Sequence, residues 1–102
     1  MPILHIINTS STMHSSLQSC LRVAQKDSAI ILIEDAVIAA KQGSHTDQLI
    51  KDILEKIKLF VLDPDVKARG IKSNQLVQGV EPVGHDGFVR LTVKYEGTQT
   101  WS

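Results

Sequence analysis

Residues 29–43 read AIILIEDAVIAAKQG, and this stretch decides the fold. Residues 29–33 form an apolar run with no polar alternation, as is typical of a strand buried on both faces. From residue 35 to residue 40 the pattern becomes helical, with Asp35 placed to cap the helix and Gly43 to end it. A buried strand followed at once by a helix predicts an α/β protein with a largely parallel sheet.

Similar apolar runs lie on both sides of this stretch, at Ile3–Ile7, residues 59–62 and, more weakly, residues 80–83. The last run contains Pro82, which cannot donate a ladder hydrogen bond and therefore favours an edge strand. Four or five strands alternating with helices predict one domain over residues 1–102. We expect a small three-layer α/β sandwich, flavodoxin-like in outline, with a mostly parallel sheet of four to five strands.

Helical periodicity fills the gaps between the runs. We expect a helix over residues 17–24, capped by a Ser or Thr from residues 9–16. The other helix signals are a capping box of Ser44 and Asp47, the pair Asp63–Pro64 at a helix start, and Gly70 at a helix end. Residues 71–79 are predicted to be a loop.

The segment FVRLTVKY, residues 88–95, fits two patterns. Its apolar and polar side chains alternate, as they do in a strand. Phe88, Leu91 and Tyr95 also fall on one face of a helix, which Asp86 could cap. The local pattern favours the strand.

Charge and composition exclude several classes of protein. Eleven basic residues balance eleven acidic ones over 102 residues, which argues against direct nucleic-acid binding and favours association with other chains. The single cysteine, Cys20, cannot form an internal disulfide and fits a reducing compartment. Since the chain has neither a secretory signal nor an apolar run of about 20 residues, we expect a cytoplasmic protein without a membrane segment.

No motif predicts a cofactor or a metal. The sequence lacks GxGxxG, GxxxxGK[ST] and GxSxG, and its four histidines lack metal-ligand spacing. Glu34 and Asp35 follow the second strand, at the sheet edge where α/β proteins bind ligands. A receiver-like site there would need more partners than Asp63 and Lys67 supply, so Asp35 is interpreted as a helix cap.

Several blocks, in order, resemble one family. The ending GFVRLTVKYEGTQTW, residues 87–101, resembles that of TusB and DsrH proteins, in which a Phe-Val-x-Leu-Thr core leads to a terminal tryptophan. The opening ILHIINTS also resembles the family, and SLQSCL around Cys20 resembles its DsrH form. ILIEDAVIAAKQG and KLFVLDPDVKARGI resemble its second and third strands with the helices that follow.

The resemblance implies a DsrEFH-like fold in which residues 88–95 are helical and a short last strand lies near Trp101. It also implies a subunit of a sulfur-relay, or sulfurtransferase, complex that is not catalytic alone. The partners would be TusC/DsrF-like and TusD/DsrE-like subunits in a heterohexamer, and a TusE/DsrC-like protein would accept the persulfide sulfur. The Tus branch thiolates the wobble uridine of tRNA, whereas the Dsr branch serves oxidative sulfur metabolism. The sequence leaves the branch open.

Candidate site residues follow from both lines of reasoning. Cys20 is the only thiol that could carry a persulfide, yet it shares an apolar helix face with Leu17 and Leu21, as a core residue would. Phe88, Tyr95 and Trp101 either complete the core or form a subunit interface. Three hypotheses stay open: an assembly subunit, an active persulfide carrier that uses Cys20, and an unrelated flavodoxin-like binding module.

Overall fold

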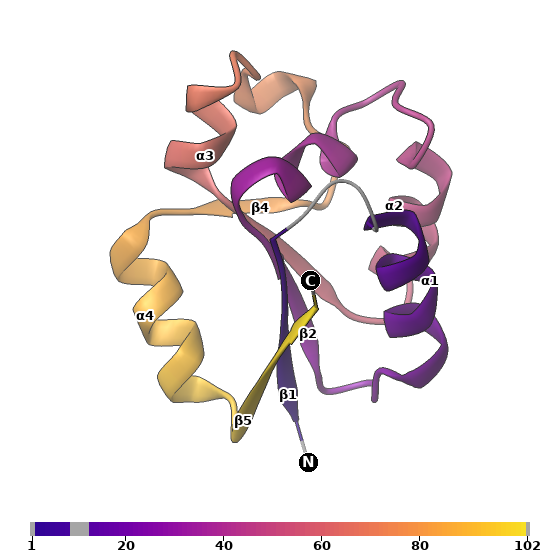
Figure 1. The fold of residues 1–102 in the computed structure, drawn as a ribbon, viewed down its shortest axis with the longest axis vertical. Coiled ribbons are helices and arrows are strands. Elements are labelled where there is room, and N and C mark those ends of the chain that lie inside the picture. Colours follow the sequence, from indigo (N-terminus) through magenta and orange to yellow (C-terminus); the bar gives the residue numbers. More distant parts are fainter. Residues whose placement is uncertain (1, 9–12, 102) are drawn as a thin grey trace.

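The structure, a computed structural model, describes residues 2–8 and 13–101, and it contains one five-stranded sheet (Figure 1). The strands are β1 Ile3–Ile7, β2 Ala29–Leu32, β3 Lys58–Leu62, β4 Glu81–Val83 and β5 Gly97–Trp101. They lie in the order β4-β3-β2-β1-β5, and every pairing is parallel. The predicted α/β class, strand number and parallel sheet are confirmed. The strand containing Pro82 lies at one edge, as its composition indicated.

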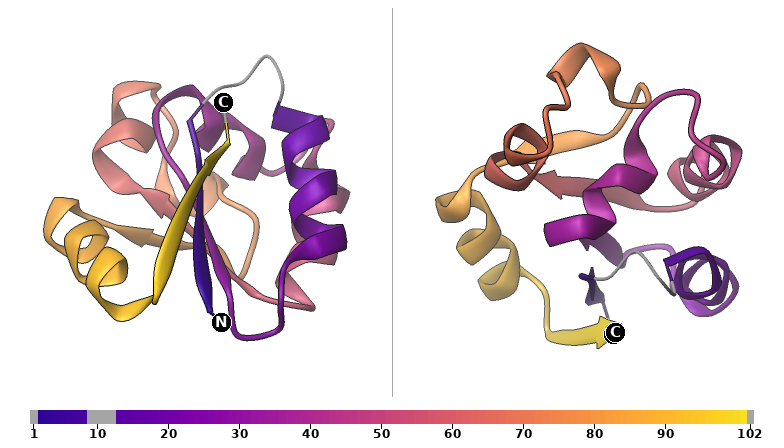
Figure 2. Two further views of the ribbon diagram at one scale, coloured as in Figure 1. Left: turned by 60° about the horizontal axis from the view of Figure 1, so that its bottom comes forward. Right: turned by 45° about the horizontal axis from the view of Figure 1, so that its top comes forward.

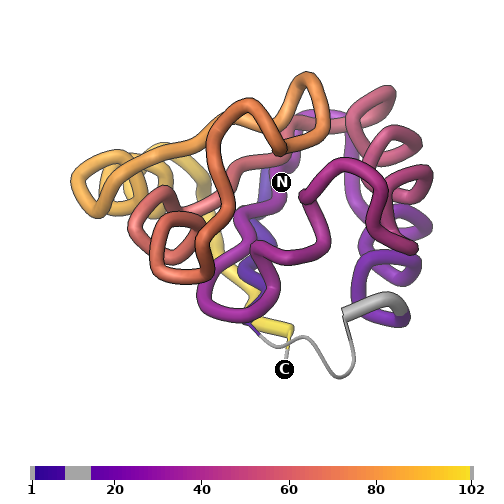
Figure 3. The backbone as a smooth tube through the Cα atoms, turned by 90° about the horizontal axis from the view of Figure 1, so that it is seen from above, coloured from indigo at the N-terminus to yellow at the C-terminus, as the bar shows by residue number. Residues whose placement is uncertain are grey.

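Helices cover both faces of the sheet. They are α1 Met13–Val23, the 3-10 helix η1 Glu34–Ala40, α2 Asp47–Leu54, α3 Asp63–Ala68, the 3-10 turn η2 Ser73–Gln75 and α4 His85–Lys94. Figure 2 and Figure 3 show α1 and α2 together on one side of the sheet and α4 on the other. In Figure 1, η1 and α3 lie above the sheet, where the strands end. The three-layer architecture follows from this arrangement.

Two apolar clusters, separated by the sheet, form the core. The larger one contains Ile30 and Leu32 of β2 together with buried residues of α1, α2, η1 and α3. The smaller one contains Ile31 of β2 and is covered by Leu91 of α4 and by Tyr95, the residue that follows this helix. Neighbouring residues of β2 thus enter opposite clusters, which explains why the strand sequence has no polar alternation.

Helix α4 corrects the local interpretation of residues 88–95. The strand pattern is wrong, and the helix implied by the family resemblance is right. Leu91 and Tyr95 are buried against the sheet, while Val89 and Val93 are 61% and 79% exposed. These two outward-facing valines created the apparent alternation, and packing of the opposite face determines the structure.

The predicted acidic helix caps are also wrong. Asp35 lies inside η1, Asp63 is the first residue of α3, and Asp86 is the second of α4. The N-cap positions of these helices are Ile33, Leu62 and Gly84, and no side-chain cap hydrogen bond is present at any of them. Asp35 instead accepts hydrogen bonds from the Arg69 guanidinium.

The capping box predicted from Ser44 and Asp47 does not form either. Thr46 is the N-cap of α2, and its hydroxyl and that of Ser44 both donate to the carbonyl of Ala39. Asp47 accepts from the backbone N–H of Gly43 at 2.7 Å. Hydrogen bonds between the end of η1, the turn after it and the start of α2 therefore replace the predicted capping box. The predicted cap of α1 involves residues 9–12, which lie outside the described residues.

Two glycine predictions have different outcomes. Gly70 has φ +71° directly after the end of α3, as expected of a helix stop. Gly43 has φ +80°, but the η1 helix already ends at Ala40. The predicted loop at residues 71–79 is confirmed apart from the short turn η2.

Candidate functional site

Cys20 lies on α1, on the face that packs against the sheet. Its side chain has no exposed surface and belongs to the larger apolar cluster with Leu17, Ile7 and Ile30. Burial raises the pKa of the Cys20 thiol to about 12, because the apolar surroundings disfavour the charged thiolate. In this conformation the sulfur is protonated and shielded, and it has the properties of a core side chain.

Trp101, on β5, contacts the same side of the sheet. Its indole Nε1–H donates a hydrogen bond to Nδ1 of His5 on β1 at 3.1 Å, and the two rings lie 6.0 Å apart at 47°. Register explains the contact, because β5 pairs with β1 along its whole length. The side chain of Trp101 is half-buried against the larger cluster.

His5 is a polar residue of the core that the sequence patterns did not single out. Its side chain is 4% exposed, and burial lowers its pKa below the usual 6.5. Since Nδ1 accepts the indole hydrogen bond, the ring is neutral and carries its proton on Nε2. A histidine inside a continuous apolar strand was the available signal, but nothing local pointed to a partner 96 residues away.

The three candidate interface aromatics are not brought together. Trp101 packs against the cluster beneath α1 and α2, whereas Phe88 and Tyr95 pack on the opposite face beneath α4. Tyr95 is 8% exposed, and Phe88 is half-buried. One patch containing all three residues is therefore excluded by the sheet that separates them.

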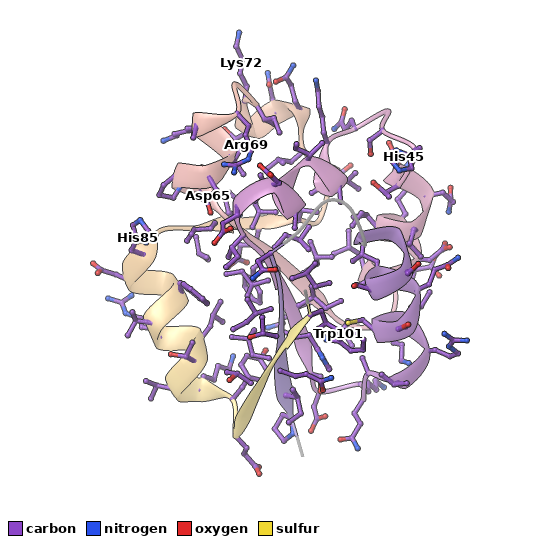
Figure 4. The ribbon with its side chains drawn as sticks, in the orientation of Figure 1. His45, Asp65, Arg69, Lys72, His85 and Trp101 are labelled. Carbon is purple, nitrogen blue, oxygen red and sulfur yellow. The ribbon has the colours of Figure 1, made fainter. Side chains whose placement is uncertain are left out.

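The carboxyl edge of the sheet holds a set of structural hydrogen bonds. Asp65 Oδ2 accepts from the backbone N–H of Glu34 at 2.6 Å, and Arg69 donates to Asp35 Oδ1 from Nε and Nη2 at 3.0 and 2.8 Å. Figure 4 shows Asp65 on α3 and Arg69 at its end, close to η1. These bonds connect α3 to η1. Glu34 has φ +52°, an unfavourable left-handed conformation that this contact helps to hold.

Metal ligation has no geometric support within residues 2–8 and 13–101. No three His, Cys, Asp or Glu side chains there come close enough to hold an ion. Figure 4 shows His45 and His85 on opposite sides of the molecule. The side chain of His14 is not among the described ones. No helix in the described part of the chain is long and apolar enough to cross a membrane.

The fold is similar to two solved structures. The ychN protein from E. coli has a TM-score of 0.85 and 18% sequence identity, with 99% of each chain covered. The protein MTH1491 from Methanobacterium thermoautotrophicum has a TM-score of 0.78 and 17% identity, with 97% of this chain and 96% of that chain covered. At these identities the similarity concerns the fold alone.

Sequence comparison identifies relatives that match over nearly the whole chain. Protein TusB of Klebsiella pneumoniae strain 342 is 34% identical over 99 residues, covering 97% of this chain and 100% of the relative. Protein TusB of Pectobacterium carotovorum is 33% identical with the same coverage. The model of the family described as DsrH like protein matches residues 9–98. An unrelated flavodoxin-like module is thereby ruled out, and the chain belongs to the DsrH family, with TusB proteins among its relatives.

Proposed function

We propose that this chain is an assembly subunit of a cytoplasmic sulfur-relay complex and does not catalyse sulfur transfer alone. Its partners are related TusC/DsrF-like and TusD/DsrE-like subunits in a heterohexamer, and a TusE/DsrC-like protein accepts the sulfur. The TusB relatives, matched along their entire length, support the branch that leads to 2-thiolation of the tRNA wobble uridine.

The burial of Cys20 is the observation that supports an assembly role. A persulfide carrier needs a thiolate that reaches the outer sulfur of a donor persulfide. Cys20 is fully buried, and its pKa is raised to about 12. A sister subunit with an accessible cysteine then carries the sulfur, while this chain supplies surface for assembly.

The outer face of α4 is the proposed site for a sister subunit. Val89 and Val93 lie one turn apart on this helix and are largely exposed, and the half-buried Phe88 adjoins them in sequence. A second contact involves Trp101, which is half-buried on the edge strand β5. Of the three aromatic candidates, Tyr95 contributes least, because little of its side chain remains accessible.

A second candidate function uses Cys20 as a persulfide carrier in a DsrH-type complex of oxidative sulfur metabolism. The presence of a cysteine at this position supports it. The thiolate would attack the outer sulfur of a donor persulfide, form a Cys20 persulfide and release the donor thiolate. This role requires α1 to move away from the sheet, because the sulfur is enclosed in the apolar cluster.

Replacement of Cys20 separates the two functions. Cys20→Ala keeps an apolar side chain in the cluster and removes the sulfur, so the assembly role predicts unchanged sulfur transfer in the reconstituted complex. Loss of transfer, with the complex still assembled at its normal mass, would establish the carrier role. The matched variant Leu17→Ala, in the same cluster, controls for effects of packing alone.

The branch is tested in cells. A strain that lacks this chain should lose 2-thiouridine from its tRNA and recover it when the gene is restored, as measured by mass spectrometry of digested tRNA. Normal 2-thiouridine in that strain contradicts the tRNA branch and favours the oxidative one.

A further inference from the structure

A cavity of about 740 Å³ opens at the amino-terminal edge of the sheet, opposite the edge that carries η1 and α3. It lies between the beginnings of β2, β3 and β4 and the end of α4. The exposed valines of the proposed assembly surface, Val89 and Val93, do not line it. Its volume is within the range of about 300–1,000 Å³ that is typical of small-molecule sites. Its apolar lining includes Leu54, Phe60 and Tyr95.

Tyr95 provides a hydrogen-bond donor in this cavity. The residue as a whole is 8% exposed, and its hydroxyl, which has no hydrogen-bond partner among the described residues, is not fully enclosed and can be reached from the cavity. Burial, with a smaller contribution from the negative charge of Asp27, raises the pKa of Tyr95 above its usual 10. The phenol therefore stays protonated, and its O–H is available to an acceptor on a ligand.

Lysines from separate elements surround the opening. Lys26 follows α1, Lys58 begins β3, and Lys94 ends α4. Within the described residues, none of the three ammonium groups pairs with a carboxylate. The ammonium of Lys94 lies 5.8 Å from the centroid of the Tyr95 ring, so positive charge is held close to the aromatic lining.

The acidic residues of the lining limit the charge of a ligand. Asp27, Glu55 and Glu81 also line the cavity, where lysines outnumber them by one. The fourth lysine, Lys56, donates to the carbonyl of Leu21 at 2.7 Å. With four lysines and three carboxylates, the lining favours a ligand that has an apolar body and a single negative charge. The three carboxylates would repel a nucleotide or another polyanion.

We propose that this cavity binds an amphipathic monocarboxylate. Its apolar body contacts Phe60 and the Tyr95 ring, which belong to the same cluster, and its carboxylate accepts a hydrogen bond from the Tyr95 hydroxyl beside Lys94. The site does not depend on the proposed sulfur-relay function and is tested separately from it.

The test is an NMR titration of the full chain with naphthalene-2-carboxylate, monitored through backbone amide signals. Binding should shift the signals of Ser28, Gly79 and Tyr95, which line the cavity. The neutral naphthalene-2-carboxamide has nearly the same shape and should bind several-fold more weakly, because its carbonyl still accepts from the Tyr95 hydroxyl but carries no negative charge. Naphthyl phosphate, a dianion, should also bind more weakly than the carboxylate.

Two variants and one control complete the experiment. Tyr95→Phe and Lys94→Gln should each weaken carboxylate binding several-fold, and the exposed Lys94 can change without affecting the fold. Lys67→Gln, on α3 at the opposite sheet edge, should leave binding unchanged. Equal affinity for the carboxylate and the carboxamide, or an absence of shifts at the cavity, overturns the proposal. Loss of probe binding on addition of sister subunits also overturns it, because the cavity would then belong to their interface.

Discussion

At the scale of single residues, Cys20 shows how burial controls the chemistry of a thiol. With a pKa of about 12, roughly one molecule in ten thousand carries the thiolate at pH 8. We therefore expect the folded chain to react with a thiol reagent such as Ellman's reagent far more slowly than the chain unfolded in urea. Labelling at similar rates in both states would mean that α1 opens readily, and would favour the carrier role.

The hydrogen bond between His5 and Trp101 also leads to a prediction. Trp101→Phe removes the indole donor and leaves Nδ1 of a buried imidazole unpaired. We expect the free energy of unfolding to fall by about 1–3 kcal/mol, the usual cost of leaving a buried polar group unsatisfied. Urea denaturation measures the change, and Gln99→Ala, on the exposed part of β5, is the control with little expected effect.

The pH dependence of stability should report the same histidine. The pKa of His5 is lowered in the folded state, so near pH 6.5 and just below it the unfolded chain binds more protons than the folded one. The free energy of unfolding therefore falls as the pH is lowered through 6.5. His5→Asn retains an acceptor but cannot titrate, so it should lose less stability than the wild type between about pH 7.5 and pH 5. An unchanged slope would show that His5 is not the titrating group. The pKa of Asp47 is lowered from 3.8, mainly by the hydrogen bond from the Gly43 N–H, so this residue affects the stability only at lower pH.

At the scale of elements, the contact between η1 and α3 stabilises an unfavourable backbone conformation at Glu34. Glu34 has φ +52°, which costs a non-glycine residue about 1–2 kcal/mol. Glu34→Gly relieves this cost and keeps the backbone N–H that donates to Asp65. We expect a higher melting temperature for this variant.

A matched control is available for the glycine substitution. Glu55 ends α2 with φ −69° and ψ −22°, an ordinary helical conformation. Glu55→Gly should lower the melting temperature, because glycine adds freedom to the unfolded chain without relieving strain. If both variants lose stability, the left-handed conformation of Glu34 is not strained in solution.

Elements were predictable from the sequence to different degrees. Strands β1 to β3 could be predicted because parallel strands covered on both faces form continuous apolar runs, whereas the exposed edge strand β4 gave only a weak run. The caps of η1 and α2 could not, because Asp35 accepts from Arg69 after α3, and Ser44 donates to Ala39 of η1. The α4 helix was obscured by its exposed Val89 and Val93. The spacing of Phe88, Leu91 and Tyr95 left a helix open, and the family resemblance decided in its favour.

At the scale of the whole molecule, the exposed valines provide a test of assembly. Val93→Glu adds a charge to the proposed sister-subunit surface, where its burial would be costly. We expect this variant to fold alone but to fail to co-purify with its partners. Val23→Glu changes a valine that is 62% exposed on α1, on the other side of the sheet, and should leave assembly intact. Equal behaviour of the two variants would contradict the assignment of the interface to α4.

The chain expressed without partners should be a weakly stable monomer or a homo-oligomer, since its zero formal net charge does not oppose association. Light scattering and thermal denaturation of the purified chain test this expectation. A robust monomer would weaken the argument from composition.

The candidate sites were less predictable than the fold. The sequence pointed to Cys20 and to three aromatic residues, but not to the pairing of His5 with Trp101 or to the cavity beside Tyr95. Lys26, Lys58 and Lys94 lie far apart in sequence, and only the order of the strands and the direction of α4 bring them to one opening. Such a site depends on topology, which periodicity alone does not give.

The pairing of β1 with β5 affects how the chain is made. Synthesis produces Ile3–Ile7 first, whereas the strand that lines its outer edge is made more than eighty residues later. Until then the nascent sheet exposes unpaired N–H and C=O groups along the outer edge of β1, where strands of other chains can pair. The ribosome-bound polypeptide should thus be most vulnerable to aggregation, and most in need of a chaperone, in the interval before residues 97–101 emerge.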